Sequence, residues 1–289
     1  MSDIRTCDLH THSTSSDGTF TPTELLREAE RCGLSAIALT DHNTVAGLPE
    51  FTEAAKGMAV EAVPGIEIST DWEDTEFHLV GLYLREEHYP TIYRMLADLA
   101  ERKKRSNIAL TEALTAAGYP LSYEELVEAA GGGQINRAHI AMALIEAGYA
   151  EDIADAFRRF LHVRNGYYCP PARPGTLDMI DMLHSMGAVS ILAHPLLSVS
   201  GERLAEFLRI ARSHGLDGIE THYVTYSPEE VALSQRIAEE AGLLESGGSD
   251  FHGARKPDIS LGTGRGGLAV PYAFLEAIRV RRDEYVSKT

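Results

Sequence analysis

The chain has 289 residues, which is enough for one large α/β domain or for one domain with a substantial insertion. Its net charge of −17 argues against a basic nucleic-acid-binding surface and against duplex DNA as a partner. A short phosphorylated substrate is still compatible with this charge, because bound divalent cations would invert the charge of a carboxylate-rich pocket. No apolar run reaches the roughly 18 residues of a membrane-spanning helix, and no apolar signal region opens the chain. We therefore expect a cytoplasmic protein without a membrane partner.

Short apolar runs and amphipathic segments alternate over the first 88 residues. Thr21, Pro22 and Glu24 form the capping-box pattern of a helix start, and we expect this helix to end at Gly33. A second helix follows near 48–56. We predict strands at 6–9, 36–40, 61–68 and 77–84. This βαβα order predicts a parallel sheet or barrel.

Strand signals are missing between residues 89 and 165, and helical signals replace them. A long charged helix passes through 101–105, a capping box begins at Ser122, and two further helices follow near 138–147 and 153–160. Alternation resumes from Gly175, with strands at 188–193, 217–220 and 243–247 and a last helix from about Tyr272. We therefore predict a barrel formed by 1–88 and 166–289, interrupted by a helical insertion at 89–165 that forms a cap on the substrate side.

The first predicted strand ends in Asp8-Leu9-His10-Thr11-His12. Side chains two apart in a strand point to the same face, so Asp8, His10 and His12 can converge on one point. Two imidazoles at a strand end are suited to holding a metal ion. A His-x-His motif alone is only moderately specific, and a partly exposed polar strand end is an equal alternative.

Similar residues stand at the ends of other predicted strands, or inside them. If the strands are parallel neighbours, these side chains gather at the carboxyl end of the sheet, where α/β proteins place their active sites. Nitrogen and carboxylate ligands without a thiolate suit Mn²⁺, Fe²⁺ or Zn²⁺ in a catalytic role. Nine ligands are too many for one ion, and two or three ions ~3.5–4 Å apart can activate a bridging hydroxide for attack on phosphorus. With Asp17 included, the nine candidates are His10, His12, Asp17, His42, Glu67, His78, His194, Asp250 and His252.

These motifs together resemble the PHP superfamily, named for its polymerase and histidinol phosphatase members. The matching motifs run in the family's order from Asp8 to His252, and include Thr40-Asp41-His42, Gly65-Ile66-Glu67, Ala193-His194-Pro195 and Ser249-Asp250-Phe251-His252. The resemblance implies a distorted (β/α)7 barrel with three metal ions. We expect these ions to be Mn²⁺, with Fe²⁺ or Zn²⁺ as alternatives. Asp8 and Asp41 would not bind the ions themselves but would orient the histidines that do.

The resemblance also implies which residues share each ion. One ion would take His10, His12, Glu67 and Asp250; a second would take Asp17, His42 and His252; and the third would share Glu67 and add His78 and His194. Asp17 stands where some members, including histidinol phosphatases, have histidine. The candidate catalytic residues are His10, His12, Asp17, Glu67, His194 and Asp250.

The helical insertion resembles the branch of this family that acts on nucleotides. Known members of that branch remove the 3′-phosphate from nucleoside 3′,5′-bisphosphates or trim short RNA from its 5′ end. Their insertion carries an Arg-x-His pair, which Arg137 and His139 match here. Arg137 could then hold a phosphate with two hydrogen bonds. The alternative is that both residues simply lie in the first turn of a helix.

Three further residues are weaker candidates for substrate contacts. Lys256 and Arg265 can bring positive charge to the mouth of the pocket. Many relatives carry a histidine shortly before Pro-Glu-Glu, but Tyr226 stands at that place here and a histidine appears at His222 instead. His222 could therefore act as the general acid, or the metal ions alone could assist the leaving group.

The sequence thus predicts a metal-dependent phosphoesterase acting on a nucleoside 3′,5′-bisphosphate or a short 5′-phosphorylated oligoribonucleotide. A cyclic phosphodiesterase or a phosphatase of sugar or histidinol phosphates would use the same metal ions. A non-catalytic accessory module is a third alternative, although such modules often lose ligands that this chain keeps. An amidohydrolase would also place histidines on a barrel, but no candidate metal-bridging lysine stands at a strand end.

Overall fold

The computed structural model describes residues 5–73, 75–129 and 135–287. The chain divides into two compact units, Met1–Tyr93 together with Pro174–Thr289, and Arg94–Arg173. We call the first the barrel unit and the second the helical unit. The helical unit and the predicted insertion share residues 94–165. The role of the insertion as a substrate-side cap stays a prediction.

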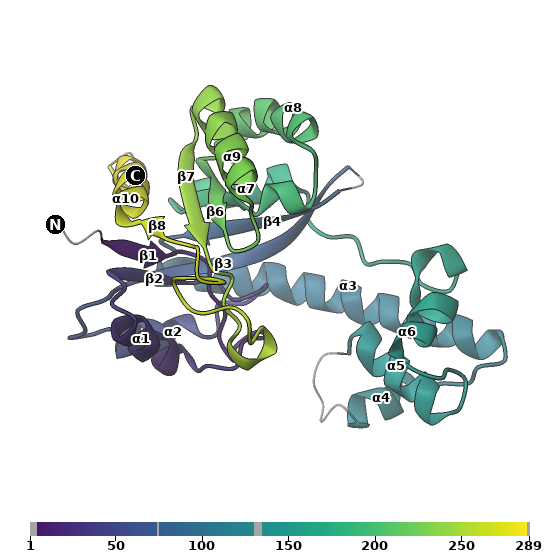
Figure 1. Cartoon of the computed structure of the whole chain (residues 1–289). Coiled ribbons are helices and arrows are strands. Elements are labelled where there is room, and N and C mark those ends of the chain that lie inside the picture. Colours follow the sequence, from purple (N-terminus) through teal and green to yellow (C-terminus); the bar gives the residue numbers. More distant parts are fainter. Residues whose placement is uncertain (1–4, 74, 130–134, 288–289) are drawn as a thin grey trace. The chain divides into compact units, whose positions relative to one another are not determined.

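The barrel unit is built on one eight-stranded sheet in the order β7-β6-β5-β4-β3-β2-β1-β8 (Figure 1). The backbone N–H of Leu9 donates to the carbonyl of Gly247 (3.1 Å), so the segment after β1 meets β7 and the sheet nearly closes into a barrel. The strands are β1 (Thr6–Asp8), β2 (Ala36–Leu39), β3 (Glu61–Trp72), β4 (Thr75–Leu82), β5 (Val189–Ala193), β6 (Gly218–Tyr223), β7 (Leu244–Gly248) and β8 (Val270–Pro271).

Helices connect most of the strands of the barrel unit. The α-helices of this unit are α1 (Pro22–Arg31), α2 (Leu48–Ala54), α7 (Thr176–Ser185), α8 (Gly201–Ala211), α9 (Pro228–Ala241) and α10 (Tyr272–Val286), with 3₁₀ turns at Glu86–His88, Pro195–Leu197, Arg212–His214 and Gly253–Arg255. The capping box predicted for α1 is confirmed, since Thr21 and Glu24 each accept a hydrogen bond from the other's backbone N–H.

The helical unit has its own apolar core, which includes Leu110, Leu144 and Phe160. The long helix α3 begins in the barrel unit and continues into this one. Its helices are α3 (Tyr89–Ala116), α4 (Tyr123–Ala129), α5 (Arg137–Glu146) and α6 (Ile153–Ala156), followed by a π-helical turn at Phe157–Leu161 and a 3₁₀ turn at Val163–Asn165.

The parallel pairing that the βαβα order predicts does not extend to β4. This strand pairs antiparallel with both β3 and β5. The reason is the length of the connection, because β3 ends at Trp72 and β4 starts at Thr75, whereas a parallel crossover needs about a dozen residues or more. A hairpin therefore replaces one helical connection. The strand β8 also pairs antiparallel, with β1.

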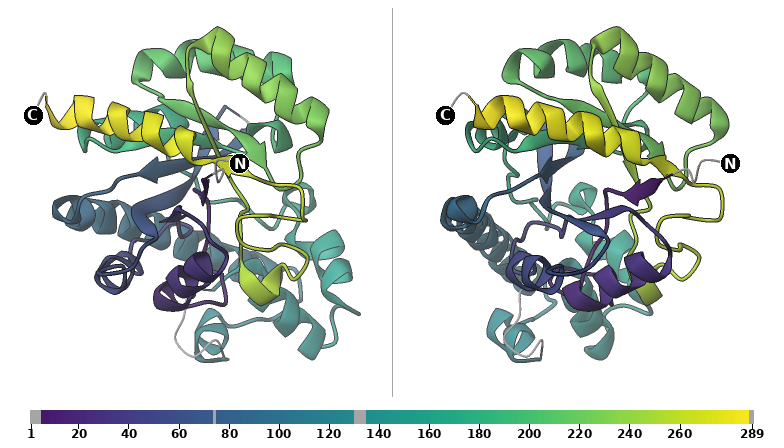
Figure 2. Two further views of the ribbon diagram at one scale, coloured as in Figure 1. Left: turned by 60° about the vertical axis from the view of Figure 1, so that its left-hand side comes forward. Right: turned by 90° about the vertical axis from the view of Figure 1, so that its left-hand side faces the viewer.

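The helix α10 closes the end of the barrel at which the parallel strands begin. Leu275 and Ile278 of this helix share one buried core with Cys7, Val63 and other residues at that end of the strands. Figure 2 shows α10, in yellow, lying across the barrel next to β1. With this end filled by apolar side chains, the opposite end is left for polar chemistry.

The three cysteines provide a test of this closed end. Cys32 and Cys169 are exposed, whereas Cys7 is fully buried, and burial raises the pKa of its thiol. We expect alkylation of the native protein at pH 8 to modify Cys32 and Cys169 and to spare Cys7 until denaturant is added, because the thiolate is the reactive form. Mass spectrometry of peptides measures each site. Modification of native Cys7 as fast as of Cys32 would show that the end covered by α10 opens.

Candidate metal centre

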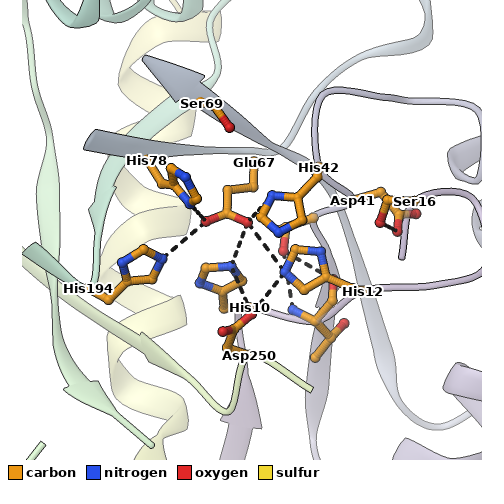
Figure 3. Close-up of polar contacts among 12 residues, drawn as sticks. His10, His12, Ser16, Asp41, His42, Glu67, Ser69, His78, His194 and Asp250 are labelled. Atoms are coloured by element: carbon orange, nitrogen blue, oxygen red, sulfur yellow. Dashed lines mark hydrogen bonds and ion pairs between the residues drawn. The ribbon is translucent and has the colours of Figure 1, made fainter. Parts of the chain in front are cut away.

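Polar side chains converge at the barrel end opposite α10 (Figure 3). His10 and His12 follow β1, His42 follows β2, and Glu67 lies in β3. Because β4 is antiparallel, His78 lies near its beginning and still reaches the same edge, paired in register with Ser69 on one side and Ala193 on the other. His194 follows β5, while Asp250 and His252 follow β7.

Glu67 lies at the centre of the cluster and is fully buried. Five imidazoles, from four segments of the chain, surround its two oxygens. The nitrogens that face it are Nδ1 of His78 (2.7 Å) and Nε2 of His194 (3.2 Å) at Oε1, and Nδ1 of His42 (2.8 Å), Nε2 of His10 (3.2 Å) and Nε2 of His12 (3.3 Å) at Oε2.

Two more carboxylates extend the cluster on the side of His12. Oδ1 of Asp250 lies 3.0 Å from Nε2 of His12 and 3.7 Å from Nε2 of His10. Oδ1 of Asp17 lies 3.2 Å from Nε2 of His252 and 4.0 Å from Nδ1 of His12. Asp17 is the most exposed of these carboxylates, with 43% of its side chain accessible, so this side of the cluster faces solvent.

Four overlapping groups in this cluster have ligand atoms within 4.8 Å of one another, which is close enough to share an ion. Each of the nine candidates from the sequence occurs in at least one group. The groups are His12, Asp17, His42 and His252; His10, Glu67 and His194; His10, His12 and Asp250; and His42, Glu67 and His78.

Several polar atoms of the cluster are buried without a hydrogen-bond partner in the described part of the chain. They are Nε2 of His10, both ring nitrogens of His12, Oε2 of Glu67 and Nδ1 of His194. An unsatisfied buried polar group costs free energy, which is why such groups are nearly always paired. Nitrogen and oxygen atoms that point at one another and lack a thiolate suit divalent metal ions. The donor set therefore fits the cations that the sequence predicts.

The charges in the cluster respond strongly to one another. Burial opposes charge on the ring of His10, but the carboxylates of Glu67 and Glu220 prevail and raise the pKa of His10 well above its usual value. Burial lowers the pKa of His12 to about 4 despite the neighbouring Asp250. Burial would raise the pKa of Glu67, yet the His10 and His42 rings hold it well below its usual range. The buried carboxylates thus attract positive charge, and a metal ion that supplied it would displace protons.

Left-handed backbone occurs at two of the ligands and beside a third. His194 has φ 32° and ψ 47°, and Asp250 has φ 53°. Asn43, which follows the ligand His42, has φ 49°. Left-handed backbone costs about 1–3 kcal/mol for a residue other than glycine. The strand ends thus keep unfavourable turns that aim His194 and Asp250 at the centre.

The carboxylates of Asp8 and Asp41 hold the loops that carry the ligands. Asp8 accepts hydrogen bonds from the backbone N–H of His10 (3.4 Å), Ser249 (2.9 Å) and Gly262 (2.8 Å). Asp41 accepts from the backbone N–H and the hydroxyl of Ser13 (2.7 and 2.6 Å). The resemblance implies that Asp8 and Asp41 orient histidines, and these contacts hold the chain next to the ligands.

Two residues of β6 that contact the ligands were missed from the sequence. The carboxylate of Glu220 lies 2.8 Å from Nδ1 of His10, and the phenol of Tyr223 donates to Asp250 (2.8 Å). A signal for Glu220 was present, because it ends the strand predicted at 217–220 just as Glu67 lies near the end of the strand predicted at 61–68. Tyr223 had no comparable signal.

The weaker candidates of the barrel unit lie in different places. The Lys256 ammonium donates to Oδ2 of Asp250 (2.6 Å), directly beside the cluster. Arg265 is paired with Asp258 (2.8 Å) at the surface, where 57% of each side chain is exposed. His222 packs its ring against Phe274 of α10, with 5.2 Å between ring centres.

Arg137 and His139 lie in the first turn of α5 within the helical unit. The Arg137 guanidinium lies over the Tyr168 ring, 4.5 Å from its centre, and donates to the carbonyl of Leu161 (3.3 Å). Nδ1 of His139 accepts from the backbone N–H of Asn136 (3.1 Å) and completes a capping box. Each residue therefore has a structural partner, and a contact with substrate stays a prediction.

The centre of histidines and carboxylates has counterparts in known proteins. The PHP domain matches residues 8–169, which is more than half of the chain and includes most of the ligand motifs. The chain belongs to the PHP family.

Two characterised relatives indicate the chemistry of this PHP protein. It is 35% identical over 248 residues to the 5′-3′ exoribonuclease Rnm of Salmonella typhimurium, covering 85% of this chain and 84% of that protein. It is 29% identical over 247 residues to the 3′,5′-nucleoside bisphosphate phosphatase of Chromobacterium violaceum, covering 85% and 86% of the two chains. Both names describe hydrolysis of phosphate esters.

A solved structure from Bifidobacterium adolescentis, proposed to be a metal-dependent phosphoesterase, shares the fold with a TM-score of 0.73 and 30% identity over 96% of both chains. The PHP protein described here is accordingly a hydrolase and a metal-dependent phosphoesterase. Its relatives act on nucleotides or RNA. Among the residues that the structure describes, no helix is long and apolar enough to cross a membrane.

The contact between Gly248 and His10 tests how tightly the centre is built. A Cβ atom added at Gly248 would lie 2.4 Å from Cβ and 2.6 Å from the backbone nitrogen of His10. We expect Gly248→Ala to push His10 away and to destabilise the protein by about 1–3 kcal/mol, as overpacking does. Denaturant unfolding with and without Mn²⁺ measures the loss. Gly267→Ala, where a Cβ meets nothing within 4 Å, is the control, and equal stability of the two variants would contradict the expectation.

Proposed function

We propose that the barrel unit binds two or three divalent metal ions and hydrolyses a phosphate monoester of a nucleotide. The observation that carries this proposal is the fully buried Glu67 with five imidazoles around it. A carboxylate in this position is suited to bridging ions, because each of its oxygens faces a different pair or triple of nitrogens. The buried atoms without partners support the same proposal.

The overlapping groups suggest how the ions share their ligands. His10, His12 and Asp250 would hold one ion together with Glu67. Asp17, His42 and His252 would hold a second, on the more exposed side. Glu67 and His78 would hold the third with His194. We expect Mn²⁺ first, with Fe²⁺ and Zn²⁺ as alternatives.

Divalent ions bound here would lower the pKa of a water molecule and neutralise the charge of the phosphate oxygens. The protein itself supplies the arrangement. Glu67 and Asp250 hold negative charge in a buried site, and the histidines stand within or shortly after the strands of the barrel. Such rigid support is what a site needs to keep its geometry during turnover.

The helical unit supports a nucleotide substrate on electrostatic grounds. Residues 94–173 contain ten basic and ten acidic side chains, so the net charge of −17 lies entirely on the rest of the chain. An anionic substrate meets less repulsion at a neutral unit than at a strongly acidic one. Arg137, held over an aromatic ring, offers a planar group that matches a phosphate. The names of the two relatives agree with a nucleotide or RNA substrate.

The metal site is tested by removing one ligand. Asp250→Ala should lose both metal content and phosphatase activity. In the proposed group of His10, His12, Glu67 and Asp250, the only carboxylate besides Glu67 is that of Asp250. Inductively coupled plasma mass spectrometry measures the metal content, and phosphate release by the same preparation measures the activity. Asp181→Asn removes an exposed carboxylate on α7 and should change neither. Full turnover and full metal content in Asp250→Ala would contradict the site.

The substrate class is tested by phosphate release from a panel. The panel contains adenosine 3′,5′-bisphosphate, AMP, a short 5′-phosphorylated RNA, histidinol phosphate and a ribose cyclic phosphate. We expect the bisphosphate or the RNA to be hydrolysed best. Preference for the small or cyclic phosphates would keep the metal site and reject the nucleotide assignment, and no hydrolysis of any substrate would favour an accessory module.

The role of Arg137 follows from the same panel. Arg137→Ala should raise KM for the preferred nucleotide about 10-fold or more, since a hydrogen bond to a charged group is worth about 1.5–3 kcal/mol. Metal content should stay unchanged. Arg164→Ala, in the 3₁₀ turn of the same unit, serves as the matched control. An unchanged KM in Arg137→Ala would assign Arg137 to the packing against Tyr168 alone.

A further inference from the structure

The strand β6 carries none of the nine proposed ligands, yet it contacts three of them. Glu220 and Tyr223, both on this strand, reach His10, His194 and Asp250. Glu220 has 1% of its surface exposed and Tyr223 has 7%. A buried carboxylate is costly unless it is well paired, so its presence behind the cluster calls for a function.

Glu220 joins two ligands with its two oxygens. Oε1 lies 2.8 Å from Nδ1 of His10, and Oε2 accepts the backbone N–H of His194 at 2.7 Å. The first contact can hold a proton on Nδ1, so that Nε2 of His10, which faces Glu67 and Asp250, would be the nitrogen that binds an ion. The second contact anchors the strained left-handed backbone of His194.

Tyr223 binds one oxygen of the Asp250 carboxylate and so fixes the direction of the other. Its phenol donates to Oδ2 of Asp250 (2.8 Å), and Lys256 donates to the same oxygen (2.6 Å). Oδ1 is turned instead towards His12 and His10. With Oδ2 held from outside, Oδ1 is the oxygen presented to the centre.

A β-bulge makes both contacts possible from one strand. Glu220 and Tyr223 are three positions apart, so a regular strand would place them on opposite faces. The pairing of β6 with β7 shifts in register between Glu220 and His222. An extra residue at a bulge re-aims the side chains that follow, so Tyr223 turns inwards with Glu220 while His222 turns outwards onto Phe274.

We propose that bulged strand β6 positions the metal ligands, with Glu220 fixing the ring of His10 and the backbone of His194, and Tyr223 fixing the inward oxygen of Asp250. Glu220 and Tyr223 are positioning residues, since they act through ligands. This inference rests on the metal site proposed above. It also gives Lys256 a role at Asp250 rather than at a substrate phosphate.

The experiment is a titration of the metal-free full-length protein with Co²⁺, followed by the visible absorption of the bound ion and by calorimetry. Glu220→Gln cannot accept hydrogen bonds from both His10 and His194, because only one end of an amide is an acceptor. Tyr223→Phe keeps the ring and removes only the hydroxyl. We expect each to weaken Co²⁺ binding about 10–100-fold, as loss of such outer hydrogen bonds does elsewhere, and to change the absorption of the bound ion.

Matched controls separate this effect from a general loss of structure. Glu245→Gln alters a carboxylate on neighbouring β7 that contacts Thr221 and Gln235, and Tyr272→Phe removes a phenol that donates to Glu61 at the opposite barrel end. Both should bind Co²⁺ as the unaltered protein does. If Glu220→Gln fails to fold, as judged by circular dichroism, the Co²⁺ binding of Tyr223→Phe alone tests the role of β6.

Activity at limiting and saturating Mn²⁺ completes the test. Saturating Mn²⁺ should restore most of kcat in Tyr223→Phe with little change in KM, because the defect is in holding the ion. If the unaltered protein binds no Co²⁺, the proposed metal site fails. If it binds Co²⁺ and both variants bind it equally well with the same absorption, the metal site stands and the role of β6 is overturned.

Discussion

The structure depends on burying one carboxylate completely at the centre of the barrel end, which costs free energy. Glu67 can remain charged there only because five imidazoles from four segments face it. Desolvation of a charge is costly, and partners must be held in place to compensate for it. The convergence of strand ends, the strained turns and the outer hydrogen bonds all serve that compensation.

The barrel reaches this arrangement by departing from a regular fold. The hairpin between β3 and β4 reverses one strand, so His78 near the start of β4 lies beside His194 after the end of β5. The bulge in β6 reverses the direction of one side chain, so Tyr223 joins Glu220 behind the ligands. The left-handed turns at His194 and Asp250 aim two ligands that regular strands would not. Each irregularity lies next to the chemistry, where strain is commonly kept.

Much of this site was predictable because metal ligands at strand ends can be recognised from a few neighbouring residues in the sequence. A histidine or carboxylate shortly after an apolar run, as at His42 and His194, has no packing reason to be there. The rule also covered Glu220, which was overlooked because it stands alone rather than in a motif. His222 was taken as a candidate because many relatives carry a histidine shortly before Pro-Glu-Glu, where Tyr226 stands here. Its direction depends on a bulge, and a bulge is set by pairing with β7.

The sequence by itself determined the alternation of strands and helices, the helical insertion, the capping of α1 and the nine residues that gather at one barrel end, because each of these follows from periodicity or from residues adjacent in the chain. Only the tertiary structure decided the reversal of β4, the hydrogen bonds by which Asp8 and Asp41 hold the ligand loops, and the support that β6 gives to His10, His194 and Asp250. Those features depend on the register between strands and on hydrogen bonds between residues far apart in the chain. Such contacts leave no periodic pattern, since either partner alone is simply a polar residue near a strand.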